Sequence, residues 1–495
     1  MRDPRARLKE FSFIAAVGVL AKLRSIILVP LMIRAFGLAD YGNWVQVIAS
    51  TSLLCGITQA NLHTTLLRYI PSADARRRAE VFYNGFFWVL GVAAVAAVLV
   101  MLVLTGLAAK YLELPPRLVF LLGPLIFVRG LYQFVNNVSR ADGHIRFYTL
   151  LDAAPAVTEI SAIVIGAVFH AKLEVCLTAM VALEGALLVA LSATIMRRMT
   201  FIWPTWTALR PLLAYALPGI PTNVGTFLLN SADRYLIGGT LGSEAVGVYS
   251  AAYALASLPS FFVRPLIIGL LPRAAKAWDA GDKAGAMKML RRSIKAYTFI
   301  GVPSAVGLAV VGPDILALSA GASRPEWTVW LLLSIGGGTW FLALVQLGIH
   351  SYLLEERVGA TAWLYIGASV VNIALNAALL VPLGLIAAGL ATTVAYAAAC
   401  IPVQLNALRR IGPVFDVRST VVAFASAGGM AAVVWFLRGP TVLRVAVAVA
   451  AGAVIYPAAA WILRYFDAEE RAYIGALVRR GPPKKPPVES APTPP

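Results

Sequence analysis

Two charged residues stand side by side in a run of the chain that is otherwise apolar. Asp233 and Arg234 lie within residues 213–239, a stretch long enough to cross a bilayer as a helix. Removing either charge from water is costly unless the fold pairs it or uses it. On a helical projection, Asn223, Asn230 and Arg234 fall within about 40° of one another. The stretch is therefore predicted to present a polar stripe and to form part of a functional site.

Two prolines favour a cavity-lining role for this helix. Pro218 and Pro221, near its start, should kink it and free backbone carbonyl groups. A polar stripe on a kinked helix suits the wall of a water-filled cavity. Two other interpretations stay open: Asp233 and Arg234 could pair with neighbouring helices and only hold the packing, or their side chains could reach the nearby interface.

A second group of charges is expected near the middle of the membrane in the first half of the chain. It comprises Lys22, Arg24, Arg129, Glu159 and Glu184. Lys22 and Arg24 are two residues apart, so they point about 160° from each other and are not expected to face one cavity together. Arg129 with Glu159 or Glu184 would make a buried pair, which serves either as structural glue or as an ion or proton site.

Arg264 adds a cation to the second half of the chain, in an apolar run where Pro265 follows it. Cations are thus expected within membrane spans of both halves. Fixed positive charge of this kind suits a substrate that carries phosphate, and it would repel a cationic drug.

Composition places the chain in a membrane. Of its 495 residues 59% are hydrophobic and only 13% are charged, which is too apolar for a soluble protein of this size. The net charge of +18 could suggest nucleic acid, but most of the charges lie in loops on one side, so no nucleic-acid partner is expected. No metal site or cofactor is predicted, because the cysteines lie in apolar runs and the histidines lack ligand spacing.

Because about 20 apolar residues span a bilayer, the chain divides into about fourteen spans. They are placed near 11–34, 42–63, 82–108, 118–139, 148–169, 173–195, 213–239, 245–271, 296–318, 329–351, 360–381, 384–406, 419–437 and 442–463. Alternate loops then hold 30 lysines and arginines on one side and 7 on the other. This asymmetry predicts a multi-pass protein with both termini in the cytoplasm.

A weak internal repeat predicts two lobes of six helices around a central cavity. A shift of 205 positions places Gly37 on Gly242 and Gly42 on Gly247, in the turns after the first and seventh spans. The predicted parts are an N-lobe at 1–198, a C-lobe at 199–410, an extra helix pair at 411–465 and a cytoplasmic proline-rich tail at 466–495. The basic segment 273–295 is expected to be an amphipathic surface helix or a solvated loop.

Several short motifs carry a resemblance to a known family. They are Gly37-Leu38-Ala39-Asp40-Tyr41-Gly42, Arg68-Tyr69-Ile70-Pro71, Asn230-Ser231-Ala232-Asp233-Arg234, Gly247-Val248-Tyr249-Ser250 and Leu271-Pro272-Arg273. In this order and spacing the chain resembles the polysaccharide-transporter branch of the multidrug/oligosaccharidyl-lipid/polysaccharide (MOP) superfamily, the Wzx-type O-antigen flippases. Their seventh helix carries a Ser-x-Asp-Arg-like motif and their eighth opens with a Gly-x-Tyr-Ser-like one.

The resemblance implies that cavity cations hold the diphosphate of a polyprenyl-diphosphate sugar. It extends to Arg234 through the motif, and to Lys22, Arg24 and Arg264 through helix and depth. The polar stripe adds two amides to the expected substrate site, Asn223 and Asn230. The expected sites of Na⁺ or H⁺ coupling, or alternatively buried pairs, are Asp233, Arg129, Glu159 and Glu184.

The predicted function is a flippase, not an enzyme, in the bacterial inner membrane. It would carry a lipid-linked oligosaccharide from the inner to the outer leaflet by alternating access, for O-antigen, lipopolysaccharide or exopolysaccharide synthesis. We expect a monomer, with a polysaccharide polymerase as a candidate partner. Two alternatives stay open: a cation-coupled exporter of the same superfamily, and a membrane-embedded glycosyltransferase or polymerase, which the short outer loops disfavour.

Overall fold

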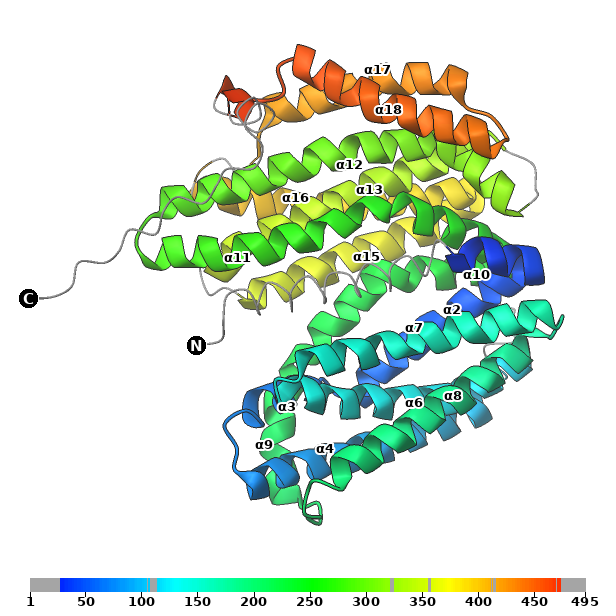
Figure 1. The fold of residues 1–495 in the computed structure, drawn as a ribbon, viewed down its shortest axis with the longest axis vertical. Coiled ribbons are helices and arrows are strands. Elements are labelled where there is room, and N and C mark those ends of the chain that lie inside the picture. Colours follow the sequence, from blue (N-terminus) through cyan, green and yellow to red (C-terminus); the bar gives the residue numbers. More distant parts are fainter. Residues whose placement is uncertain are drawn as a thin grey trace, which may run out of the picture.

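The computed structural model describes residues 27–104, 106, 114–320, 325–354, 358–410, 412, 415–468 and 470–472. These residues are almost entirely helical and include no strand. The helices form two bundles, with a further helix pair packed on the outside of one of them (Figure 1). The predicted all-helical membrane fold with two lobes and a C-terminal helix pair is confirmed.

The first bundle, the N-lobe, is built from the first third of the described chain. Its helices are Ile27–Phe36, α2 (Leu38–Thr58), α3 (Leu62–Tyr69), α4 (Ala75–Leu99) continued by the π-helix η1 (Val100–Leu104), α6 (Pro116–Ala141), α7 (Ile145–Val168) and α8 (Leu173–Met196). Helix α9 (Trp206–Ala216) belongs to the segment expected to begin the C-lobe, yet it packs against α3 and α4 (Figure 1).

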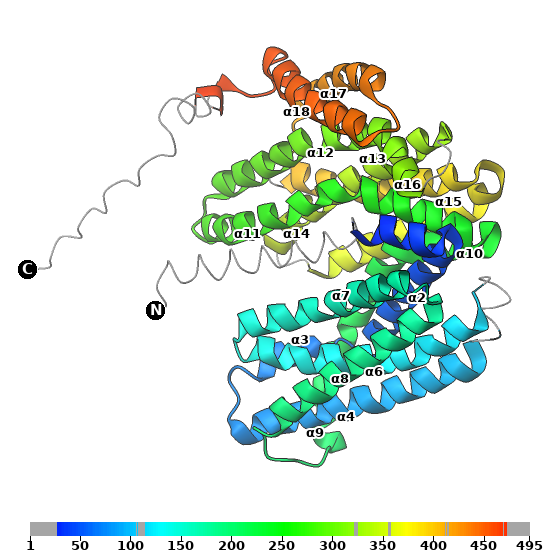
Figure 2. The ribbon, with the colours of Figure 1, turned by 45° about the vertical axis from the view of Figure 1, so that its right-hand side comes forward.

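The second bundle, the C-lobe, follows a short 3₁₀ turn, η2 (Leu217–Gly219). Its elements are α10 (Ile220–Ala256), η3 (Leu258–Phe262), α11 (Val263–Asp279), α12 (Lys283–Ala320), α13 (Trp327–Gly348), α14 (His350–Leu354), α15 (Val358–Leu383) and α16 (Leu385–Arg410). The extra pair, α17 (Val417–Leu437) and α18 (Val442–Ile462), packs on α12 and lies beyond it from the rest of the bundle (Figure 2).

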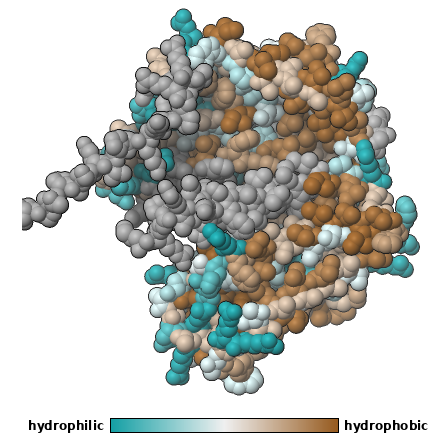
Figure 3. Space-filling view, viewed as in Figure 1, coloured by the Kyte–Doolittle hydropathy of each residue, from teal (hydrophilic) through white to brown (hydrophobic). Residues whose placement is uncertain are grey.

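The surface of both bundles is suited to lipid. Large apolar side chains stand exposed, among them Phe436 at 85%, Leu102 at 78% and Val381 at 75%. Hydrophobic residues cover wide areas of the visible flanks, and hydrophilic ones gather toward the helix ends (Figure 3). In the described part of the chain, ten helices are long and apolar enough to cross a membrane, or up to eleven if a bent pair counts as one. The total of fourteen spans stays a prediction.

The helix run from α9 to α10 is broken, as its prolines predict. η2 contains Pro218, and the axis bends by 46° between Trp206–Gly219 and Asn223–Ala256. Since α9 packs on the N-lobe and α10 packs on α13 and α15, this run passes from one bundle to the other. The seventh predicted span therefore joins the two lobes at its bend.

Two equivalent glycines open equivalent helices. Gly37 has φ 89° and ψ 170°, and Gly242 has φ 83° and ψ 173°. Both conformations are in the positive-φ region that favours glycine. The two residues are 205 positions apart, so the backbone repeats where the sequence repeat predicts it. Gly242 also divides α10, so residues 220–241 and 243–256 form two helical parts.

The eighth predicted span and the basic segment 273–295 need correction. The span is interrupted at the 3₁₀ helix η3, whose second residue is Pro259. The basic segment forms neither a separate surface helix nor a loop, because it is shared between the end of α11 and the start of α12. Gly281, with φ 84°, turns the chain there, and Asp282 caps α12 by accepting a hydrogen bond from the backbone N–H of Gly285 at 2.8 Å.

Ionic contacts hold the extra helix pair at its basic end. Lys295 of α12 has only 10% of its side chain exposed, and its Nζ lies 2.6 Å from the Glu470 carboxylate and 3.8 Å from that of Asp467. The Tyr465 hydroxyl donates to the Lys295 carbonyl at 2.7 Å. Arg291 of the same helix lies 3.6 Å from Asp416, which caps α17. These contacts anchor the start of α17 and the segment that follows α18 to α12.

Asp416 makes this anchor sensitive to acid. Burial raises the pKa of its carboxyl, but hydrogen bonds from Ser419 and the charges of Arg291 and Lys295 outweigh burial and hold the pKa below the usual 3.8. A lowered pKa means that the stabilisation is complete above the unfolded-state pKa. It is lost as the pH falls through the lower folded-state pKa.

Replacement of Lys295 by methionine is expected to lower the free energy of unfolding by about 1–2 kcal/mol, since Glu470 loses a largely buried partner. Thermal unfolding of the full chain in detergent at neutral pH measures the loss. Lys276→Met removes an exposed amine from α11 and is the matched control, with no change expected. Equal midpoints for the two variants would show that the ion pair does not anchor the helix pair.

Candidate functional site

Asp233 is buried in the C-lobe with several partners. Its side chain is 3% exposed. One carboxylate oxygen, Oδ1, accepts a hydrogen bond from the backbone N–H of Arg234 at 2.9 Å and lies 3.4 Å from the Arg234 guanidinium. The other, Oδ2, accepts a hydrogen bond from the Tyr249 hydroxyl. The carboxylate is thus compensated on both oxygens, as a charge removed from water requires.

Arg234 is held within the same lobe. Its Nη1 donates to the Asn230 carbonyl at 2.6 Å, one turn earlier in α10. Its guanidinium carbon lies 4.8 Å from the centre of the Tyr253 ring, a cation–π geometry. Only 13% of the side chain is exposed. The cation that the motif singles out is therefore paired and stacked rather than free in solvent.

The polar network extends from α10 to two other helices. The Tyr249 hydroxyl lies 3.4 Å from Oγ1 of Thr392 in α16, and the Asn372 amide of α15 donates to that oxygen at 3.4 Å. The Tyr396 hydroxyl of α16 donates to Oδ1 of Asn230 at 3.1 Å. A carboxylate, hydroxyls and amides in an apolar lobe could hold a proton or a hard cation. Among the described residues, no three His, Cys, Asp or Glu side chains are placed so that they could hold a metal ion together.

The N-lobe has its own buried ion pair. Arg129 of α6 donates through Nε to Glu184 of α8 at 3.0 Å and through Nη2 at 2.5 Å. The side chains are 9% and 0% exposed, and the Thr158 hydroxyl adds a bond to Glu184 at 3.4 Å. Of the two carboxylates that the sequence left open, Glu184 forms the bidentate pair. Glu159 of α7 is 2% exposed and acts electrostatically on Arg129.

The remaining predicted residues are placed differently. Asn223 is exposed at the start of α10, where its amide donates to Oδ1 of Asn61 in the N-lobe at 3.3 Å. Arg264 lies in the first turn of α11. Lys22 and Arg24 lie outside the described residues. The structure therefore brings together Asp233, Arg234 and Asn230 in one lobe and Arg129 with Glu184 in the other.

The aromatic and hydroxyl partners were not predicted from the sequence. Tyr249 and Tyr253 are four residues apart, so they share one face of a helix, and this spacing within the eighth-span motif could have indicated them. Asn372 and Asn376 show the same spacing in an apolar run. Thr392 and Tyr396 repeat it on α16. Each pair places two polar side chains on one face of a helix. The pattern indicates a functional site only once the fold brings these faces close to the Asp233 carboxylate.

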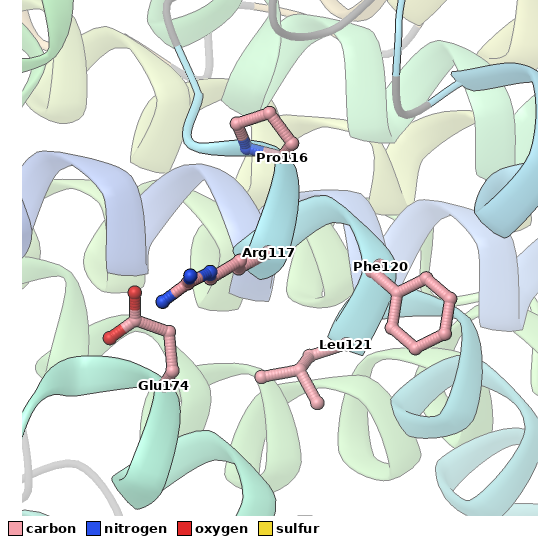
Figure 4. A pocket seen from close by; sticks show the side chains of 5 residues that line it. All are labelled: Pro116, Arg117, Phe120, Leu121 and Glu174. Atoms are coloured by element: carbon pink, nitrogen blue, oxygen red, sulfur yellow. The ribbon is translucent and has the colours of Figure 1, made fainter.

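A separate pocket of about 470 Å³ opens at the starts of α6 and α8. Its lining residues are Pro116, Arg117, Phe120, Leu121 and Glu174. Arg117 and Glu174 point toward one another across it, above the two apolar side chains of α6 (Figure 4). It includes none of the predicted substrate residues, so it is not the candidate site.

The comparison with protein families covers the motif region. A model described as "polysaccharide biosynthesis protein" matches residues 7–278, more than half of the chain. The chain belongs to this family. The match includes the Asp233–Arg234 pair, its tyrosine partners and the whole N-lobe. The membership predicted from the short motifs is confirmed.

Two curated proteins that are similar to this chain come from Haloferax volcanii. The probable flippase AglR is 26% identical over 248 residues, which cover 48% of this chain and 50% of the relative. The probable low-salt glycan biosynthesis flippase Agl15 is 20% identical over 196 residues, covering 39% and 41%. The chain spans about half the length of the curated relatives it matches.

Solved structures show the same fold. The lipid II flippase MurJ in an inward closed conformation matches with a TM-score of 0.77 over 93% of this chain and 99% of its own, at 13% identity. An inward-facing multidrug resistance MATE transporter of the MOP superfamily matches with a TM-score of 0.58 over 79% and 94%, also at 13% identity. At this identity the likeness establishes the architecture alone, a helical membrane protein of two lobes.

Arg129→Met is expected to destabilise the protein by about 3–5 kcal/mol, because Glu184 would remain buried without its partner. The double variant Arg129→Met/Glu184→Met should recover most of this loss, since it removes both charges. Thermal unfolding in detergent measures both. A double variant as unstable as the single one would show that the pair is not the interaction lost.

Proposed function

We propose that this protein is a flippase that moves a polyprenyl-diphosphate-linked oligosaccharide from the inner to the outer leaflet of a bacterial cytoplasmic membrane. The observation that carries the proposal is the buried Asp233–Arg234 pair on the helix run that joins two lobes. Membership of the polysaccharide biosynthesis family and the flippase names of the Haloferax volcanii relatives support it. The sugar would belong to a surface polysaccharide such as O-antigen or exopolysaccharide.

The proposed movement is alternating access, with no bond made or broken. The loops rich in lysine and arginine face the cytoplasm by the positive-inside rule, so the end that carries Gly37 and Gly242 faces outward. The headgroup enters between the lobes from the basic end. The lobes then rock about the bend at Leu217–Gly219, which lies where the chain passes from one lobe to the other.

Arg234 couples substrate to ion in this proposal. Its guanidinium already pairs with Asp233, so a diphosphate can recruit it only by competing with that carboxylate. Once Arg234 turns to the phosphate, Asp233 keeps its hydrogen bonds from Tyr249 and from the Arg234 backbone but loses the neighbouring positive charge, and it binds a proton or Na⁺. Anion and cation would thus bind together. Arg264, one of the two cations Lys22 and Arg24, and the two amides of the polar stripe would complete the headgroup site.

A second candidate is a cation-coupled exporter of the same superfamily, favoured by the likeness to the MATE transporter fold. Its substrate would be a cation. The arginines and lysines expected within the membrane spans of this chain disfavour such a substrate, because they would repel it. We take the protein to act as a monomer, because one chain supplies both lobes. A polysaccharide polymerase that consumes the product outside is the proposed partner.

Complementation of a flippase-deficient bacterial strain tests the anionic headgroup. The intact chain should restore surface polysaccharide, and Arg234→Ala or Arg264→Ala should reduce it by at least about tenfold, the effect of losing one charge-assisted contact to phosphate. Arg444→Ala on α18, an exposed position outside both lobes, is the control at matched membrane abundance. Full rescue by both Arg234→Ala and Arg264→Ala would show that these arginines do not bind the substrate.

Ion coupling is tested with the purified chain in proteoliposomes. An imposed pH or Na⁺ gradient should accelerate movement of a fluorescent lipid-linked oligosaccharide by the intact protein. Asp233→Asn should abolish this acceleration, because a neutral amide takes up no proton in this pH range and offers Na⁺ no negative charge. Glu326→Gln changes an exposed carboxylate and should respond as the intact protein does. A gradient response that survives Asp233→Asn would place the coupling site elsewhere.

A further inference from the structure

The two lobes touch most closely where two glycine-bearing helices cross. A Cβ atom at Gly42 of α2 would lie 1.9 Å from the carbonyl oxygen of Ser243 in α10. A Cβ atom at Gly247 would lie 2.2 Å from the carbonyl oxygen of Leu38. Both distances are impossible for a side chain, so the backbones meet directly. Because 38 and 42 correspond to 243 and 247 in the 205-residue repeat, the contact is reciprocal.

This contact continues along one face of α2. Gly42, Gln46 and Ser50 are spaced by four residues and share that face. The Gln46 amide lies against Gly238, where an added Cβ would approach Nε2 to 2.9 Å. The Ser50 and Tyr235 hydroxyls are hydrogen-bonded at 2.9 Å. We call this contact between residues 42–50 and 235–247 the lobe seam.

Gln46 opposes closure of the lobe seam. Its side chain is 0% exposed, and neither Nε2 nor Oε1 has a hydrogen-bond partner among the described residues. The hydroxyl of Ser243, at the crossing, is likewise buried without one. An amide buried unpaired loses its hydration without compensation. When the lobes part, water can reach it, so the amide favours the open seam.

Arg34 favours closure. It lies in the last turn of the N-lobe helix Ile27–Phe36, and its guanidinium crosses to the last turn of α12 in the C-lobe. Nη2 donates to the Leu318 carbonyl at 2.6 Å and Nε to the Ser319 carbonyl at 3.2 Å. The last carbonyls of a helix have no partner within the helix, and a cation there also interacts well with the helix dipole. Both bonds break when the lobes part at this end.

We propose that Arg34 and Gln46 act in opposite directions on the lobe seam, Arg34 as the latch of its closed state and Gln46 as the group that keeps this state reversible. Closure at this end would leave access between the lobes only from the other end, as alternating access requires. The inference rests on the proposed movement of the lobes, but not on the identity of the substrate.

Thiol labelling of the full chain in lipid nanodiscs measures seam opening. Ser243→Cys places a reporter in the buried crossing, and the native Cys55, Cys176 and Cys400 are themselves buried. Arg34→Gln should raise the rate of maleimide labelling about two- to fivefold, as expected for loss of one helix-end cation. Gln46→Met, of similar size without the amide, should lower the rate at least about fivefold.

Controls separate gating from loosening of the fold. Glu244→Cys is exposed beside the reporter and should label at one rate in every background. Arg34→Lys keeps a cation at the helix end and should lie between the parent and Arg34→Gln. Asn43→Cys, buried on the N-lobe side of the crossing, repeats the measurement if Ser243→Cys folds poorly.

The outcomes are distinct. Opposite shifts in labelling by the two variants support the proposal, whereas equal rates, or shifts in the same direction, overturn it. Movement of lipid-linked oligosaccharide is then measured in proteoliposomes of the same variants. Opposite shifts in labelling without any lipid movement by the parent would leave the seam mechanism standing and reject the proposed flippase function.

Discussion

A charge that leaves water for an apolar bundle must be compensated there, and this constraint organises both lobes. In the C-lobe, Asp233 is compensated by Tyr249 and Arg234. In the N-lobe, Glu184 is compensated by Arg129 through a bidentate pair. Each carboxylate finds its partners within its own lobe, so neither network ties the lobes together. The proposed movement of the lobes would therefore break neither ion pair by itself.

Contacts between the lobes include the hydrogen bonds of Arg34 to α12 and of Asn223 to Asn61, and two further places connect them. At the bend around Leu217–Gly219, the chain itself passes from the N-lobe to the C-lobe. At the lobe seam, backbones meet at Gly42 and Gly247, and an unpaired amide at Gln46 faces the partner helix. A covalent joint and a contact of small residues with imperfect polar pairing suit the proposed separation of the two lobes. A large, fully satisfied interface would hold one state.

The pairing of Arg234 changes how its role is understood. An arginine in a membrane span suggests a ready anion site, but this one is stacked on Tyr253 and bonded to its own helix. In the proposed function, a phosphate would have to displace existing contacts, so its binding would depend on what replaces Arg234 at Asp233. Competition for one cation would then link two ligands without any long pathway between sites.

The sequence alone determined the features that depend on local composition: the apolar helices, the break at Pro218, the paired glycines at 37 and 242, and the Asp233–Arg234 motif. Each reflects a residue's own hydration or backbone preference. Only tertiary structure decided that Arg129 selects Glu184 rather than Glu159, that Thr392 and Tyr396 join a carboxylate more than 150 residues earlier, and that residues 273–295 extend two antiparallel helices. Those outcomes depend on which helices pack together and at what rotation, and an apolar helix carries little sequence signal for either, because most of its faces are equally hydrophobic.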